Sequence, residues 1–306
     1  MLMTLAATIL TAGTLTAQTD TTFSVNPGSR LDVNNFGGQV VVQVWGKNAV
    51  RVEATHSNRA RIEIDQSGSN IEVRSTVVRM RLPRIERGEH RVVLPAIPMH
   101  VDYKITVPAW IAIGLTGVYS DLTVKGTRGD VSAETVKGDV KVNGGDGLIR
   151  ASSVQGFVTV EGAKGRLQVT SVNEGAIISD IAGDVSVEAV NGDVTLDRIN
   201  SQMVEASTVN GDVTYLGVVR DGGRYRFSSH RGDLVVHVPE HVSAAISVET
   251  FSGDFDSDFP IQFWKEKPGK RSFHFTLGSG SAQIDLETFE GTIALRHGVV
   301  MKNKEK

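Results

Sequence analysis

A nine-residue repeat constrains the fold of this chain more than any other feature. Ten units run from Gly129 to Val219, with Ser201 inserted once between the eighth and ninth units, and GDVSVEAVN (residues 183–191) is typical. The third and fifth positions are apolar in every unit, which is the period of two of a β-strand with one side facing a core. Gly opens eight of the ten units, which is incompatible with a continuous helix and favours turns.

One unit supplies a strand and a corner, so two units make one flattened coil. Later Gly-Asp pairs agree, because Asp193, Asp212, Asp233 and Asp254 are 19, 21 and 21 residues apart. We therefore predict an all-β fold: a parallel β-helix with about 18–21 residues per coil and coils stacked at about 4.8 Å. The eighth position is apolar in nine units, and we expect Val190 to belong to the same core set as Val185 and Val187.

Alternating apolar stretches continue on both sides of the repeat, from Leu31 to Leu295, without a low-complexity linker. We therefore predict one domain at residues 18–297, followed by a charged tail at residues 298–306. A separate β-sandwich before residue 110 is the alternative. Residues 1–17 are uncharged and too short to span a bilayer, and small residues near Ala17 favour a signal peptide. The alternative for this segment is a buried N-terminal strand.

The composition narrows the class of function. A net charge of −3 and a pI near 6.3 argue against nucleic-acid or anionic-membrane binding. There is no Cys, so we expect neither a disulfide framework nor a lipidated cysteine. We also expect no cofactor and no integral membrane span in the mature chain.

The Gly-Asp-Val units resemble the bacterial "putative adhesin" family of unknown function, which is related to the head (GIN) domain of autotransporter adhesins. Further stretches are similar to the family's opening, middle and closing strands: residues 23–33, 38–45, 103–108 and 280–295. The resemblance covers most of the chain and implies a single-stranded, right-handed parallel β-helix that is exported to the cell envelope. It implies no catalytic residue.

The aspartates Asp193, Asp212, Asp233 and Asp254 are expected on one corner of successive coils. Stacked carboxylates repel, so they either hold a cation such as Ca²⁺ or each cap their own turn. We favour capping, because the Gly-Gly-x-Gly-x-Asp pattern of calcium-binding nonapeptides is absent. Three asparagines at equivalent positions predict a structural amide ladder: Asn173, Asn191 and Asn210.

Other motifs have structural alternatives. Arg-Gly-Asp, which on a tight loop can be an integrin ligand, occurs at residues 128–130 and 231–233. We expect a structural role instead, because Gly-Asp belongs to the repeat and the preceding position is usually polar. His237 and His241 are separated by Pro239 and are not expected to bind a metal. Two basic stretches are solvated loops or anion-binding surfaces. The first stretch is the candidate ligand-contact set and contains Arg79, Arg81, Arg84, Arg87 and Arg91. The second contains Lys265, Lys267, Lys270 and Arg271.

Aromatic residues crowd the C-terminal part. We expect them to cap the open end of the solenoid, with a partner-docking patch as the alternative. They are Phe251, Phe255, Phe259, Phe263, Trp264, Phe273, Phe275 and Phe289.

These features together predict an exported, non-enzymatic, adhesin-like protein of the periplasm, cell surface or extracellular space, whose partner is a protein or glycan of the envelope. An envelope-stress or signalling partner is the alternative. A polysaccharide lyase or hydrolase is a further one, but coils with short corners leave little wall for the cleft and paired carboxylates that such an enzyme needs.

Overall fold

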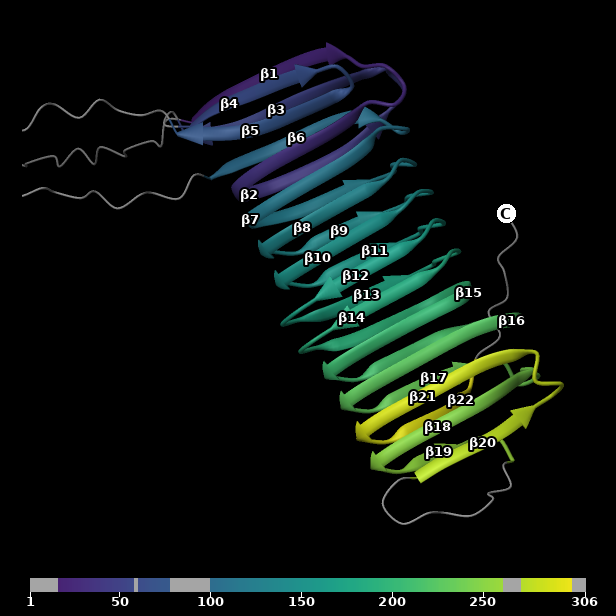
Figure 1. Ribbon diagram of the computed structural model, residues 1–306. Helices are drawn as coiled ribbons and strands as arrows, with labels where there is room; N and C mark the ends of the chain where they lie inside the picture. Colours follow the sequence, from purple (N-terminus) through teal and green to yellow (C-terminus); the bar gives the residue numbers. More distant parts are fainter. Residues whose placement is uncertain (1–15, 58–59, 78–99, 261–270, 299–306) are drawn as a thin grey trace, which may run out of the picture.

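The computed structural model describes residues 16–57, 60–77, 100–260 and 271–298 as a long stack of strands (Figure 1). The strands belong to one 22-stranded sheet, which confirms the all-β prediction. No helix in these residues is long and apolar enough to cross a membrane.

The middle of the stack is built from strands that alternate between two faces. The first face contains β8 (Val131–Lys137), β10 (Ile149–Gln155), β12 (Leu167–Ser171) and β14 (Val185–Ala189). The second face contains β9 (Val140–Asn143), β11 (Val158–Glu161) and β13 (Gly175–Ser179). Two longer strands, β15 (Asp193–Asn210) and β16 (Val213–Arg231), contribute to both faces.

Pairing along each face is parallel. Ile149 lies between Val131 and Leu167, so neighbours on the first face are 18 residues apart. Val158 lies between Val140 and Ala176 on the second face with the same separation. We call the turn from the first face to the second the first corner, and the return turn the second corner.

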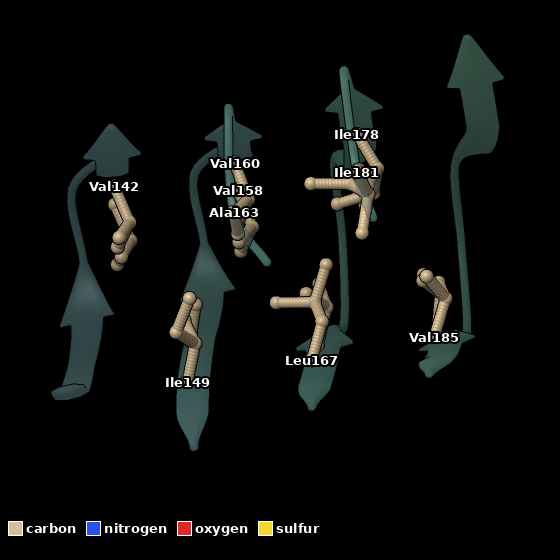
Figure 2. Close-up of a cluster of buried hydrophobic side chains, with 14 of the residues drawn as sticks. Val142, Ile149, Val158, Val160, Ala163, Leu167, Ile178, Ile181 and Val185 are labelled. Carbon is tan, nitrogen blue, oxygen red and sulfur yellow. The ribbon is translucent and has the colours of Figure 1, made fainter. Parts of the chain in front are cut away.

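The core fills the space between the faces. Third- and fifth-position side chains such as Val158 and Val160 point inward from strands of both faces (Figure 2). Each fully buried Val, Leu or Ile contributes about 1.5–3 kcal/mol, so stability grows coil by coil.

The eighth position of the repeat departs from the prediction that its apolar side chains belong to the core. At the second corner Ala163, Ile181 and Ile199 are buried, but at the first corner Val136 and Val190 are 50% and 40% exposed. Val190 is therefore not a core residue.

Backbone geometry explains this difference. At the first corner the strand alternation continues through an inward hydroxyl at the seventh position, for example Ser153, so the eighth residue faces out. At the second corner the seventh residue has a positive φ, 71° at Gly162 and 56° at Asp180, which breaks the alternation and turns the eighth residue inward.

At the N-terminal end, β2 (Arg30–Trp45) lies between β7 (Ala112–Lys125) and the pair β5 (Asn70–Val77) and β6 (Val101–Pro108). Antiparallel partners cover the outer side: β3 (Ala49–Ser57) on β6, β1 (Thr16–Ser24) on β3, and β4 (Ala60–Ser67) on β5. The described residues before 110 therefore continue the sheet of the middle coils.

At the C-terminal end the order of coils differs from the order of the sequence. β21 (Ala282–Glu290) and β22 (Ile293–His297) lie between the coil of β16 and β17 (Leu234–Val238) and that of β18 (Ala244–Ser252) and β19 (Phe255–Ser257) (Figure 1). β20 (Arg271–Leu277) runs antiparallel on the outer side of β18.

The connection from β20 to β21 passes the start of β18 and is fastened there. The backbone N–H groups of Ser279 and Ser281 donate to Oγ of Ser243 at 3.1 and 3.2 Å. The Ser243 carbonyl accepts the N–H of Ala282 at 3.0 Å. One serine thus fixes the crossover that inserts the last coil.

Candidate functional site

The aspartates of the first corner connect neighbouring coils. Oδ1 of Asp193 accepts the N–H of Asp212 at 2.9 Å, and Oδ1 of Asp212 accepts the N–H of Asp233 at 2.8 Å. The prediction that each aspartate caps its own turn is therefore wrong. Each of these carboxylates accepts its hydrogen bond from a backbone N–H of the next coil.

The predicted aspartate column is also interrupted. Oδ1 of Asp233 accepts the N–H of Thr292 at 2.7 Å, because the inserted coil lies between Asp233 and Asp254. Asp254 instead accepts a hydrogen bond from Arg271 at 2.8 Å. Among the described residues, no three His, Cys, Asp or Glu side chains are grouped as metal ligands.

Replacing Asp212 distinguishes coil linkage from calcium binding. Asp212→Asn should cost less than about 1 kcal/mol because the amide oxygen still accepts the N–H, whereas Asp212→Ala should cost about 1–2 kcal/mol. Urea unfolding with and without millimolar calcium measures both. A parent stability that rises with calcium, and stops rising in Asp212→Asn, would restore the calcium interpretation.

The remaining first-corner motifs serve the stack. The amide ladder is confirmed, since Asn210 donates to Asn191 at 2.9 Å and Asn191 donates to Asn173 at 3.4 Å. In the Arg-Gly-Asp at residues 231–233, the arginine pairs with Glu290 at 3.4 Å and the aspartate holds Thr292. The other, at residues 128–130, lies at a second corner, where Asp130 accepts the N–H of Leu148 at 2.8 Å.

The second corner carries an ion pair between coils. Arg198 donates from Nε to Asp180 at 2.6 Å and also contacts Asp197. The Arg198 guanidinium lowers the pKa of the Asp180 carboxyl below its ordinary value, against a smaller opposing effect of burial. Because both residues have positive φ without being Gly, this pair holds a strained turn in register.

Several predicted site residues lie outside the described part of the chain: Arg79, Arg81, Arg84, Arg87, Arg91, Lys265, Lys267 and Lys270. Phe263 and Trp264 lie outside it too. His237 is on β17 and His241 lies in the following turn.

The structure divides the C-terminal aromatic residues into two groups. Phe255, Phe273 and Phe275 pack against the core and Phe259 is buried, so this group caps the end. Phe251 and Phe289 are 56% and 46% exposed, stacked with ring centroids 4.7 Å apart and planes at 5°. This second group lies on the outer surface, as the docking-patch alternative requires.

The exposed pair continues the outward eighth positions of the first corner. We call this row of side chains the first-corner column; in stacking order it contains Val136, Val154, Val172, Val190, Val209, His230, Phe289 and Phe251. A continuous apolar row on a surface is typical of an interaction site.

A groove of about 460 Å³ lies beside the aromatic end of this column. One wall is formed by His230, Phe289 and Phe251, and the other by Ser228, Glu287 and Glu249. Its floor is the row of residues between them, whose side chains are buried: Thr208, Ser229, Thr288 and Thr250. The repeat spacing places each aromatic residue where Val136 stands in its own unit, but it does not tell whether that side chain faces out.

A family model described as Toastrack DUF4097 matches residues 15–296. The chain belongs to the Toastrack DUF4097 family. The Toastrack match includes both ends of the stack, so the inserted coils and the groove are parts of the Toastrack domain. The relation to the GIN domain stays a prediction.

Among solved structures, this Toastrack chain is similar to a "putative cell adhesion protein" from Clostridium sporogenes, with 10% identity, a TM-score of 0.23, and 92% of this chain and 100% of that chain covered. It is also similar to a "putative adhesin" from Parabacteroides merdae, with 9% identity, a TM-score of 0.31, and 72% of this chain and 91% of that chain covered. A search of curated proteins finds no match to the chain.

Proposed function

We propose that this protein is an exported, non-enzymatic, adhesin-like binding protein of the cell envelope, folded as a right-handed parallel β-helix. The observation that carries the proposal is the first-corner column. Four of its five valines are at least 39% exposed, whereas Ala163, Ile181 and Ile199, at the same position of the second corner, are buried. Val218, at a later second corner, is 47% exposed.

The chemistry of the corners supports binding rather than catalysis. Carboxylates such as Asp193 and Asp212 hold backbone N–H groups of the next coil, and hydroxyls such as Ser153 and Ser229 donate to glycine carbonyls at 2.8 and 2.9 Å. These groups are committed to the stack. The outward column is not used in this way, and its length suits contact with an extended surface.

Export and binding are tested together in the native host. We expect mass spectrometry to find a mature chain beginning near Gln18 outside the cytoplasm, which would retain most of β1. Purified mature protein should bind intact cells, and a triple variant, Val136→Ser, Val154→Ser and Val190→Ser, should bind about tenfold less.

Circular dichroism spectra of the parent and the triple variant should match, which would show that the variant is folded. Serine at inward positions would instead unfold the chain. An intact Met1 on cytoplasmic protein, or equal cell binding by parent and variant, would contradict the proposed function.

A further inference from the structure

The groove beside Phe251 spans three neighbouring coils of the stack. Ser228 on β16 pairs in register with Glu287 on β21, and Glu287 pairs with Glu249 on β18. The same pairings align His230, Phe289 and Phe251, each of which lies two residues further along its strand. The groove therefore runs across the strands, with one polar and one aromatic wall.

The aromatic wall has no role in the core. His230 stacks on Phe289 with centroids 4.8 Å apart, and Phe289 stacks on Phe251, yet all three side chains are exposed. Phe251 is the last described ring of this stack. Exposed aromatic surface next to polar groups is typical of ligand sites, where the ring meets the apolar side of a ligand.

The polar wall sets the charge that a ligand must have. Glu287 is an exposed carboxylate of this wall, and Glu249 lies beside it on the adjacent strand. The described residues that line the groove include no Lys or Arg. Anionic ligands are therefore repelled, whereas hydroxyl and amino groups find acceptors.

The backbone of the groove is closed to an added peptide strand. β21 is hydrogen-bonded to β16 on one side and to β18 on the other, and β18 is bonded to β21 and β20. Peptide recognition by strand addition needs an unpaired edge. Recognition here must come from side chains alone.

We propose that this groove binds a hexose-based glycan that carries no acidic groups. The apolar C–H face of a pyranose packs against Phe251 and Phe289, and its hydroxyls, or an amino group, donate to Glu287, while Ser228 adds a hydroxyl. The inference rests on the proposed function and names the ligand class of its surface.

Calorimetric titration with chitotetraose, cellotetraose and tetragalacturonate tests the inference on the mature protein. We expect at least one of the two neutral tetramers to bind and the uronate not to bind. Phe251→Ala should lower the affinity for the neutral ligand about tenfold. Glu287→Gln should reduce the discrimination against the uronate, a change that a purely structural role would not produce.

Phe157→Ala is the matched control, because Phe157 is an exposed aromatic residue outside both the column and the groove and should leave glycan affinity unchanged. An unaltered melting temperature confirms that Phe251→Ala is folded. Cell binding without binding of either neutral tetramer would overturn the glycan groove and leave the adhesin-like function standing. Preferential uronate binding, or equal affinity of parent and Phe251→Ala, would also overturn it. Loss of both cell and glycan binding would overturn both proposals.

Discussion

One residue inserted between Ser186 and Val187 of β14 is expected to lower the free energy of unfolding by about 4 kcal/mol or more. The insertion reverses the side-chain alternation on one side of the new residue. Either Val185 or Val187 then leaves the core, and a polar neighbour such as Glu188 turns into it. Urea unfolding measures the change.

The matched control is one residue inserted beside Ser201. Val185 pairs with Val204, 19 residues away, whereas Val131 and Ile149 are 18 apart, so the second corner already holds an extra residue. The pairing of β15 with β16 is irregular at the same corner. We expect the control to cost less than about 1 kcal/mol. Equal costs for both insertions would show that the strand register is wrong.

Gly211→Ala is expected to cost about 3 kcal/mol or more, because two effects add. Gly211 has a φ of 156°, and a Cβ there would overlap the carbonyl of Gly192 on the preceding coil. That carbonyl also accepts the hydroxyl of Thr208 at 3.1 Å. Neither the Gly192 carbonyl nor the backbone of residue 211 can move to relieve this overlap without separating two coils.

Gly222→Ala provides the comparison for thermal and urea unfolding. Gly222 has a φ of 73°, but a Cβ added to it would meet no atom within 4 Å, so only the backbone cost of about 1–2 kcal/mol applies. If Gly211→Ala costs no more than Gly222→Ala, close stacking of the glycines does not explain their place in the repeat.

The strands of the middle coils were accessible from the sequence because burial and alternation act locally. Val158 and Val160 are two apart, both apolar and both buried. The direction of the eighth side chain could not be predicted from the sequence, since it depends on the backbone conformation of the preceding residue. Gly162 offers a local signal for a positive φ, but Asp180 and Arg198 adopt the same conformation without one.

The order of the last coils could not be read from spacing. Asp233 and Asp254 are separated by one coil length, and Phe251-Ser-Gly-Asp and Phe289-Glu-Gly-Thr are equally good corners. Local preferences accept both orders. Pairing between distant strands, together with the fastening of the crossover at Ser243, selects the observed one.

The candidate groove was only partly predictable for the same reason. A cluster of aromatic residues pointed to the C-terminal end, and both a cap and a docking patch were consistent with it. Which rings face out follows from the corner that each occupies: Phe251 and Phe289 occupy first corners, whereas Phe273 and Phe275 lie on the antiparallel strand β20 and pack inward.

Insertion of β22 between β17 and β19 also has a mechanical consequence. A pull on the chain at Gly298 is transmitted to β22 along its length, and the hydrogen bonds to two flanking strands oppose it in shear. Bonds loaded in shear must break together, whereas an outermost strand could be peeled away one bond at a time. At the other end of the stack, the first strand β1 instead lies on the outer side, paired with β3. A tether attached near Gly298 would therefore be anchored within the stack, at a place that resists tension, whereas one attached near Thr16 would pull on an outer strand.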